Sequence, residues 1–331
     1  MAQIEKRNND ALHANPDVFH YFSDTDIRLT VRGSDWYWAV TAVMIVSTLC
    51  FLGLSFTVPR RNRIFHYITA GITMVAAIAY FTMASNLGYA SIIVEFARSD
   101  PKLRGYTREI FYVRYIDWFV TTPLLLLDLL LTAGLPWPTI VYTILLDEIM
   151  IVTGLVGALV ASSYKWGYFV FATVALFGIA YNVCWVARLH ANRLGSNVSQ
   201  TFLLCGVWTI FLWFIYPISW GVSEGGNLIP PDSEAIFYGV LDILAKPCFG
   251  ALLLWGHRNI DPAILGLHIR DYDDEIVVDE KAHHGVGAAA APTNGLTGTG
   301  ATTDNEVLGS RSNAVVGENT VTAEPNTTTT V

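Results

Sequence analysis

Two titratable residues lie in the middle of one long apolar stretch of this sequence. Asp242 and Lys246 are four residues apart within 234–256, so on a helix they share one face. A buried lysine without a partner loses its proton or costs several kcal/mol, and Asp242 supplies one partner. A lysine desolvated in an apolar pocket is also how proteins activate an amine toward a carbonyl. Lys246 is therefore a candidate for a structural ion pair or for covalent chemistry.

A second group of titratable residues lies within 110–131. Arg114 and Asp117 are three residues apart and share a helix face. Asp117 also lies at a similar depth to Asp242 when both are counted from the same membrane side. These positions predict a buried cation held between two carboxylates, with Arg114 nearby to balance them.

Other acidic residues occur at membrane depth. Charges there are expensive, so each is a functional hypothesis, although a single one can also be a snorkelling or interhelical hydrogen-bonding side chain. The further acidic residues inside apolar stretches are Asp128, Asp147 and Glu148.

An aromatic stripe lies on another apolar stretch. Trp213, Tyr216, Pro217 and Trp220 are spaced i, i+3, i+4 and i+7, which puts them on one face of a helix. Such a stripe is more often packing than a cofactor site. Beside a buried lysine flanked by acids, a large, flat, apolar ligand becomes the better interpretation.

Seven apolar stretches, each of about 20 residues or more, are long enough to cross a bilayer. They run near 36–58, 65–89, 110–131, 136–160, 166–188, 201–222 and 234–256. Hydrophobic residues make up 53% of the 331 residues and charged residues only 15%, well below the roughly 25% of a soluble domain. Lys246 is the only lysine within these stretches. The predicted fold class is all-α membrane, a seven-transmembrane-helix bundle in contact with membrane lipid.

The regions outside the spans set the domain boundaries. Residues 1–33 are polar, 34–257 form the membrane domain, and 258–331 form a tail. The tail is expected to be disordered from about residue 282, because it has hardly any large apolar residue. The net charge of −8 gives no sign of a nucleic-acid partner, and the four cysteines, all in apolar segments, predict no metal site.

Loop charges predict the orientation. Three arginines lie within 60–63 and two within 188–193, which favours a cytoplasmic position for both regions. Basic residues within 98–108 work against this, but they are mixed with acids. The balance favours an N-terminus outside the cell and a C-terminus in the cytoplasm.

Several sequence runs resemble helices of the microbial (type 1) rhodopsins. They are RYIDW at 114–118 with TTPLLLLD at 121–128, DEIMIVTGLVGA at 147–158, WFIYPISW at 213–220 and LDILAK at 241–246. The resemblance spans all seven stretches, roughly 36–257. With GSDWYWAV at 33–40, it resembles the fungal proton-pumping branch of that family.

The resemblance implies all-trans retinal joined to Lys246 as a protonated Schiff base, in a pocket at the core of the bundle. It implies a light-driven outward proton pump in the plasma membrane, a transporter rather than an enzyme. Asp117 would be the counterion and proton acceptor, Asp242 the second counterion and Asp128 the proton donor. Asp128 lies 11 residues beyond Asp117, about 16 Å along a helix.

The same resemblance assigns proton release and the pocket wall. Glu224 and Glu234 match the pair that releases the proton outside, and Arg114 would swing between the counterion and that pair. On the second span, the ring-facing tyrosine of the archaeal pumps has no clear equivalent. The implied pocket residues are Trp118, Thr121, Thr122, Met150, Gly154, Trp213, Tyr216 and Trp220.

Other functions differ at single positions. A photosensory receptor with a slow photocycle is the alternative, although sensory members usually lack a titratable residue at the position of Asp128. An anion pump would need a neutral residue at Asp117. A seven-helix chemoreceptor would bind no retinal. Retinal and protons are thus the expected partners, and the sequence leaves a homo-oligomer open.

Overall fold

The computed structural model describes residues 25–94, 105–267 and 269. Most of the predicted polar N-terminal segment and the tail predicted to be disordered from about residue 282 lie outside the described residues. Within the described part, seven helices are long and apolar enough to cross a membrane, and this confirms the predicted fold class.

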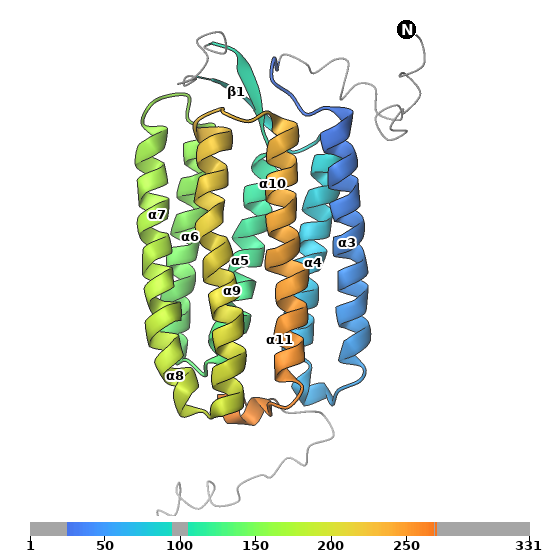
Figure 1. The fold of residues 1–331 in the computed structure, drawn as a ribbon, viewed down its shortest axis with the longest axis vertical. Helices are drawn as coiled ribbons and strands as arrows, with labels where there is room; N and C mark the ends of the chain where they lie inside the picture. Colours follow the sequence, from blue (N-terminus) through green and yellow to red (C-terminus); the bar gives the residue numbers. More distant parts are fainter. Residues whose placement is uncertain (1–24, 95–104, 268, 270–331) are drawn as a thin grey trace, which may run out of the picture. The chain divides into compact units, whose positions relative to one another are not determined.

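The helices follow one another up and down the bundle (Figure 1). The first four spans are α3 (Val31–Ser55), α4 (Ile64–Ala84), α5 (Tyr112–Thr132) and α6 (Trp137–Leu159). The fifth comprises α7 (Lys165–Tyr181), η3 (Asn182–Ala187) and α8 (Arg188–Arg193), and the sixth comprises α9 (Ser196–Trp220) and η4 (Gly221–Gly225). The seventh comprises α10 (Pro231–Ile243), η5 (Leu244–Cys248) and α11 (Phe249–His257). Single-turn helices η1 (Arg60–Asn62) and η6 (Pro262–Leu265) lie between spans and after the last one.

Some predicted boundaries were wrong by several residues. The first helix begins at Val31 rather than 36, because Thr30 caps it by accepting a hydrogen bond from the Arg32 amide. The second helix ends at Ala84 rather than 89. The fifth begins at Lys165, so Lys246 is not the only lysine within a span.

A β-hairpin that the sequence did not reveal joins α4 to α5. Strand β1 (Ala90–Ile93) pairs antiparallel with β2 (Thr107–Ile110), with Ala90 opposite Ile110. Ile27 forms a parallel bridge to Arg108 on the hairpin. We call the end of the bundle that bears this hairpin the hairpin end, and the end where α11 finishes the tail end.

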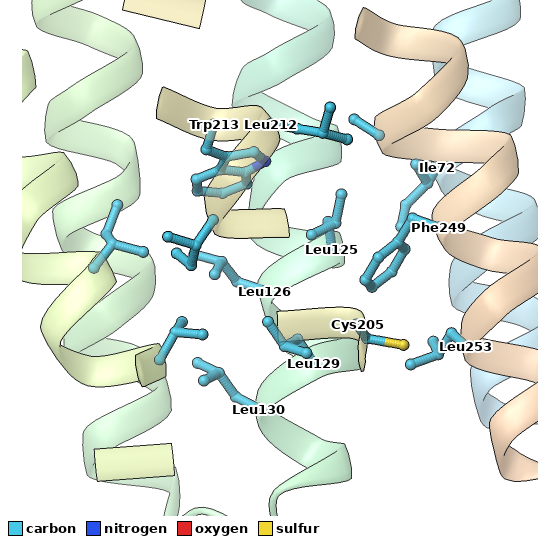
Figure 2. Close-up of a cluster of buried hydrophobic side chains, with 14 of the residues drawn as sticks. Ile72, Leu125, Leu126, Leu129, Leu130, Cys205, Leu212, Trp213, Phe249 and Leu253 are labelled. Atoms are coloured by element: carbon cyan, nitrogen blue, oxygen red, sulfur yellow. The ribbon is translucent and has the colours of Figure 1, made fainter. Parts of the chain in front are cut away.

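The tail-end half of the interior is apolar. Leucines from one face of α5 pack with side chains of α9 and α11 in the main buried cluster, and Figure 2 shows these side chains between the helices. The labelled members of this cluster are Ile72, Leu125, Leu126, Leu129, Leu130, Cys205, Leu212, Trp213, Phe249 and Leu253.

The last span is interrupted at Lys246. The π-helical segment η5 contains Lys246 and Pro247, and Pro247 has no N–H to donate to the preceding turn. The Leu244 carbonyl accepts from the Phe249 amide, five residues on, and from the Trp208 indole at 2.9 Å. Single π-helical turns of this kind are frequent at functional sites.

Candidate functional site

The amine of Lys246 lies between two carboxylates from different spans. Its Nζ donates hydrogen bonds to Oδ2 of Asp117 on α5 and, at 3.2 Å, to Oδ2 of Asp242 on α10. All three side chains are at most 3% exposed. The spacing of the two pairs in the sequence therefore predicted this juxtaposition. An amine so placed has two carboxylates as partners and almost no contact with solvent.

Asp242 is held by three further side chains. The hydroxyl of Tyr80 on α4 donates to Oδ2 at 2.7 Å, and the hydroxyl of Tyr216 on α9 donates to Oδ1 at 2.6 Å. The indole of Trp118 also donates to Oδ1, at 3.4 Å. On the second span, where the resemblance offered no clear equivalent of the ring-facing tyrosine, Tyr80 is fully buried and contacts this carboxylate.

The Lys246 amine faces a cavity with apolar walls. Tyr115 and Tyr238 add two aromatic rings that the sequence resemblance did not assign, and Phe169 lies in ring contact with Trp220 at 5.2 Å. Every pocket residue implied by the resemblance lines this cavity. The lining comprises Tyr115, Trp118, Thr121, Thr122, Leu125, Met150, Ile151, Gly154, Phe169, Ala172, Thr173, Leu176, Trp213, Tyr216, Pro217, Trp220, Tyr238, Asp242, Ala245 and Lys246.

The hairpin-end half holds a buried ionic cluster. One guanidinium nitrogen of Arg114 donates to Glu234 at 2.7 Å and to Glu224 at 3.2 Å, and the other donates to the hydroxyl of Tyr37 at 2.9 Å. Arg114 therefore forms its ion pairs with the two glutamates, which is one of the two positions between which the resemblance implies that it swings; within the described residues no ion pair joins it to Asp117.

Two more basic residues belong to this cluster. Arg108 donates to Glu234 at 2.6 Å and to the Ile229 carbonyl at 2.8 Å. Lys165 donates to the Glu224 carbonyl at 2.7 Å. Both side chains are nearly fully buried, so Arg108 is not the exposed loop charge that the orientation argument took it for.

Glu109, next to Arg108, fastens the N-terminal segment over the cluster. Its Oε2 accepts from the Leu29 amide at 2.6 Å. Burial raises the pKa of Glu109 to about 7, although the Leu29 amide and the Asn86 side chain stabilise its charged form. At neutral pH this carboxyl is therefore close to its own midpoint of protonation.

The tail-end half offers a contrasting acid. Asp128 is fully buried, and neither of its carboxyl oxygens has a hydrogen-bond partner within the described residues. Asp147 accepts a hydrogen bond from Thr122 at 2.7 Å. Its neighbour Glu148 is half-buried and does not line the cavity around Lys246.

Comparisons with known proteins agree with this architecture. The family described as bacteriorhodopsin-like protein matches residues 33–260. The chain belongs to the bacteriorhodopsin-like family. It is 67% identical to the opsin-like protein carO of Fusarium fujikuroi over 273 residues, which cover 82% of this chain and 89% of that protein.

Solved structures in the same family are similar in fold. The light-driven proton pump LR (Mac) from Leptosphaeria maculans is 37% identical with a TM-score of 0.67, covering 72% of this chain and 99% of that one. The light-driven proton pump of Coccomyxa subellipsoidea is also 37% identical, with a TM-score of 0.65, covering 69% of this chain and 98% of that one. Halorhodopsin, a light-driven chloride pump, is 26% identical with a TM-score of 0.66, covering 71% and 98%.

Family membership fixes the general chemistry. Members of this family are light-driven ion pumps rather than enzymes in the ordinary sense, and they bind retinal through a Schiff base to a lysine. The structure is consistent with such a group, because a buried amine faces a cavity lined by flat aromatic side chains.

Proposed function

We propose that this protein is a light-driven outward proton pump of the plasma membrane, with all-trans retinal held by Lys246 as a protonated Schiff base. The observation that carries the proposal is the position of the Lys246 amine, bonded to Asp117 and Asp242 at one end of an aromatic cavity. The similarity to two solved light-driven proton pumps supports it.

Retinal, when bound, would supply absorption of visible light and an isomerisation that reorients the N–H at the Lys246 nitrogen. Asp117 would accept the proton from that nitrogen, since it is the carboxylate bonded to it with a second oxygen, Oδ1, still unpartnered in the described structure. Asp242 would stay ionised, because Tyr80 and Tyr216 donate to its two oxygens.

The two halves of the bundle would then move the proton in one direction. Asp128, on the tail-end side of the site, would return a proton to the Lys246 nitrogen from its apolar surroundings. Glu224 and Glu234, held by Arg114 at the hairpin end, would release one to the outside. This requires the hairpin end to face outward, with the tail in the cytoplasm. Each proton moved against 100 mV then costs about 2.3 kcal/mol.

A chloride pump receives less support. An anion beside the Lys246 amine would have to share that site with two carboxylates, Asp117 and Asp242, and like charges in a buried site repel. A photosensory receptor with a slow photocycle would keep the same pocket, so only a measurement of transport separates it from a pump.

The test is illumination of cells that express the full chain with all-trans retinal, recording external pH with and without a protonophore. The proposal expects acidification that the protonophore abolishes. Coloured protein without acidification would instead support the photosensory alternative, and absence of colour would support a chemoreceptor.

Variants at the site assign the roles. Lys246→Ala should abolish the visible band, and a persistent band would refute the attachment residue. Asp117→Asn should red-shift absorption and stop acidification. Glu148→Gln is the matched control on a neighbouring span, because Glu148 does not line the cavity, and it should leave both unchanged.

A further inference from the structure

A buried histidine lies at the tail end of the bundle, close to the predicted proton donor. His257 ends α11 and is 9% exposed. Its Nε2 lies 3.1 Å from the hydroxyl of Thr132, and its Nδ1 lies 2.8 Å from the Leu253 carbonyl. The hydroxyl of Thr132 also donates to the Asp128 carbonyl at 2.7 Å. A chain of contacts thus runs from the imidazole to the residue that carries the buried carboxyl.

These contacts define which imidazole protons can be present. A carbonyl only accepts hydrogen bonds, so Nδ1 facing Leu253 must carry a hydrogen. The Thr132 hydroxyl has one hydrogen, and it is donated to the Asp128 carbonyl. Every contact is satisfied at once when Nε2 also carries a hydrogen and donates it to Thr132. The contacts are therefore compatible with a transient imidazolium, while burial of the ring favours the neutral form with hydrogen on Nδ1 at rest.

The same histidine lines a cavity at the tail end of the bundle. This cavity has a volume of about 380 Å³, which is room for several water molecules, since each occupies about 30 Å³ in the liquid. His66 on α4 faces it too, and the buried Nδ1 of His66 has no hydrogen-bond partner in the described structure. Polar and aromatic lining residues include Thr57, Asn62, His66, Trp255, His257 and Arg258.

Asp128 has no other described polar route toward this end. Its carboxyl oxygens have no hydrogen-bond partner within the described residues, and its neighbours along α5, residues 124–127 and 129–131, are all leucines. The four of these that Figure 2 labels lie in the apolar core. Thr132 is four residues further along α5, about 6 Å toward the tail end. Its hydroxyl contacts the imidazole of His257 and the backbone carbonyl of Asp128, the residue that carries the carboxyl group.

We propose that His257 is the proton relay through which Asp128 is recharged from the tail-end solution, with Thr132 as the connecting hydroxyl and His66 at the entrance. The inference rests on the proposed function, in which Asp128 gives its proton to the Lys246 nitrogen. In the relay step the Thr132 hydroxyl turns from the Asp128 carbonyl, to which it donates at rest, toward the Asp128 carboxylate. Its O–H bond breaks as that proton passes to the carboxylate, and a new O–H bond forms on Thr132 as the Nε2–H bond of the imidazolium breaks. Nε2 then regains a proton from water in the cavity.

A purely structural role for His257 is the competing explanation. Its ring packs against the Phe65 ring with a centroid separation of 4.0 Å, so the imidazole could serve as packing alone. The substitution His257→Phe retains an aromatic ring against Phe65 and removes both nitrogens. His190→Phe is the matched control, because His190 lies on α8 at the same end and does not line the cavity.

The experiment follows proton uptake by the full chain with retinal after a light flash, using a pH-sensitive dye and the infrared band of the Asp128 carboxyl. His257→Phe should slow reprotonation of Asp128 by about 100-fold, the lower end of the range for a positioned acid–base group. Added imidazole should restore the rate, while the melting temperature and the His190→Phe rate should stay at wild-type values. Unchanged uptake in His257→Phe, or slow uptake that imidazole does not restore, would overturn the relay.

A measurement in the dark is independent of the light reaction. Nitrogen-15 NMR of the unilluminated protein should show His257 with hydrogen on Nδ1, and the opposite tautomer would contradict the relay geometry. Wild-type protein that shows no light-driven uptake would overturn the proposed function itself. Wild-type uptake with an unaffected His257→Phe variant would overturn the relay alone.

Discussion

The two halves of the bundle bury acidic groups in opposite ways. At the hairpin end, Glu224 and Glu234 share Arg114, and Arg108 binds Glu234 as well. At the tail end, Asp128 is buried among leucines without a hydrogen-bond partner in the described structure. An acid bonded to arginines is held ionised, whereas an unpartnered acid in an apolar region is cheapest when neutral. The difference suits the tail end to storing a proton, and the hairpin end to holding acids ionised, ready to take up and pass on a proton that arrives from the Lys246 site.

The largest effect on stability is expected from Arg114→Ala. This change leaves Glu224 and Glu234 as buried carboxylates without their shared cation, and breaking a buried pair in this way costs about 3–5 kcal/mol. The free energy of unfolding, measured by SDS titration of the protein in detergent micelles, should fall by that amount. Arg61→Ala, at an exposed arginine, should change it by about 0.5 kcal/mol or less. Equal effects would remove the distinction between buried and exposed arginines.

A smaller loss is expected from Lys165→Met. This substitution keeps an unbranched apolar side chain but removes the amine that donates to the Glu224 carbonyl. A buried carbonyl left without its donor costs about 1–3 kcal/mol. The same SDS titration measures it. A loss as large as that of Arg114→Ala would mean that Lys165 is a full member of the ion-pair network rather than a support for the backbone at Glu224.

The raised pKa of Glu109 predicts that stability at the hairpin end depends on pH. Burial raises its pKa to about 7 from an ordinary 4.5, so the folded state binds this proton more tightly than the unfolded state. Its contribution to stability is then fully present below about pH 4.5 and is lost as the pH rises through 7. Proteolysis of the N-terminal segment should therefore accelerate from about pH 4.5 to about pH 7 and level off above that, and Glu109→Gln should flatten this profile. An unchanged profile in the variant would assign the dependence to another group.

The smallest effect on stability is expected from Asp128→Asn. The carboxyl has no described hydrogen bond to lose, so the free energy of unfolding should change by about 1 kcal/mol or less. Return of the proton to the Lys246 nitrogen should nevertheless slow about 100-fold, because a positioned proton donor is lost. Flash photolysis measures the rate. A stability loss that matches Arg114→Ala would show that Asp128 is ionised in the dark, which would break the contrast between the halves.

Local spacing predicted much of the site. Asp242 and Lys246 are four residues apart, and hydrophobic length located the spans that carry them, because a bilayer-spanning segment must be helical and apolar. The roles of these residues stay predictions until the variants are measured.

Contacts between residues far apart in the chain were not predictable in this way. Arg108 and Glu234 are separated by 126 positions. In the sequence Arg108 resembles an ordinary loop arginine, and only the β-hairpin brings its side chain into the buried ionic cluster. Tyr80, in an apolar helix, has the pattern of an ordinary membrane tyrosine, and only the packing of α4 against the last span brings it to Asp242. The π-helical turn at Lys246 has no periodic signal, although Pro247 could have indicated a break.

The π-helical turn also has a mechanical consequence. The last span consists of two regular helices, α10 and α11, joined by the π-helical segment η5. The N-terminal end of α10 is held by Asp232, which accepts a hydrogen bond from the backbone N–H of Thr30 at 2.8 Å. The second helix, α11, ends at His257. The π-helical turn at Lys246 can absorb a tilt of α11, because the extra residue in this turn weakens the backbone hydrogen bonds there. A tilt of α11 is thereby taken up at η5 and is not passed on to α10 and the ionic cluster.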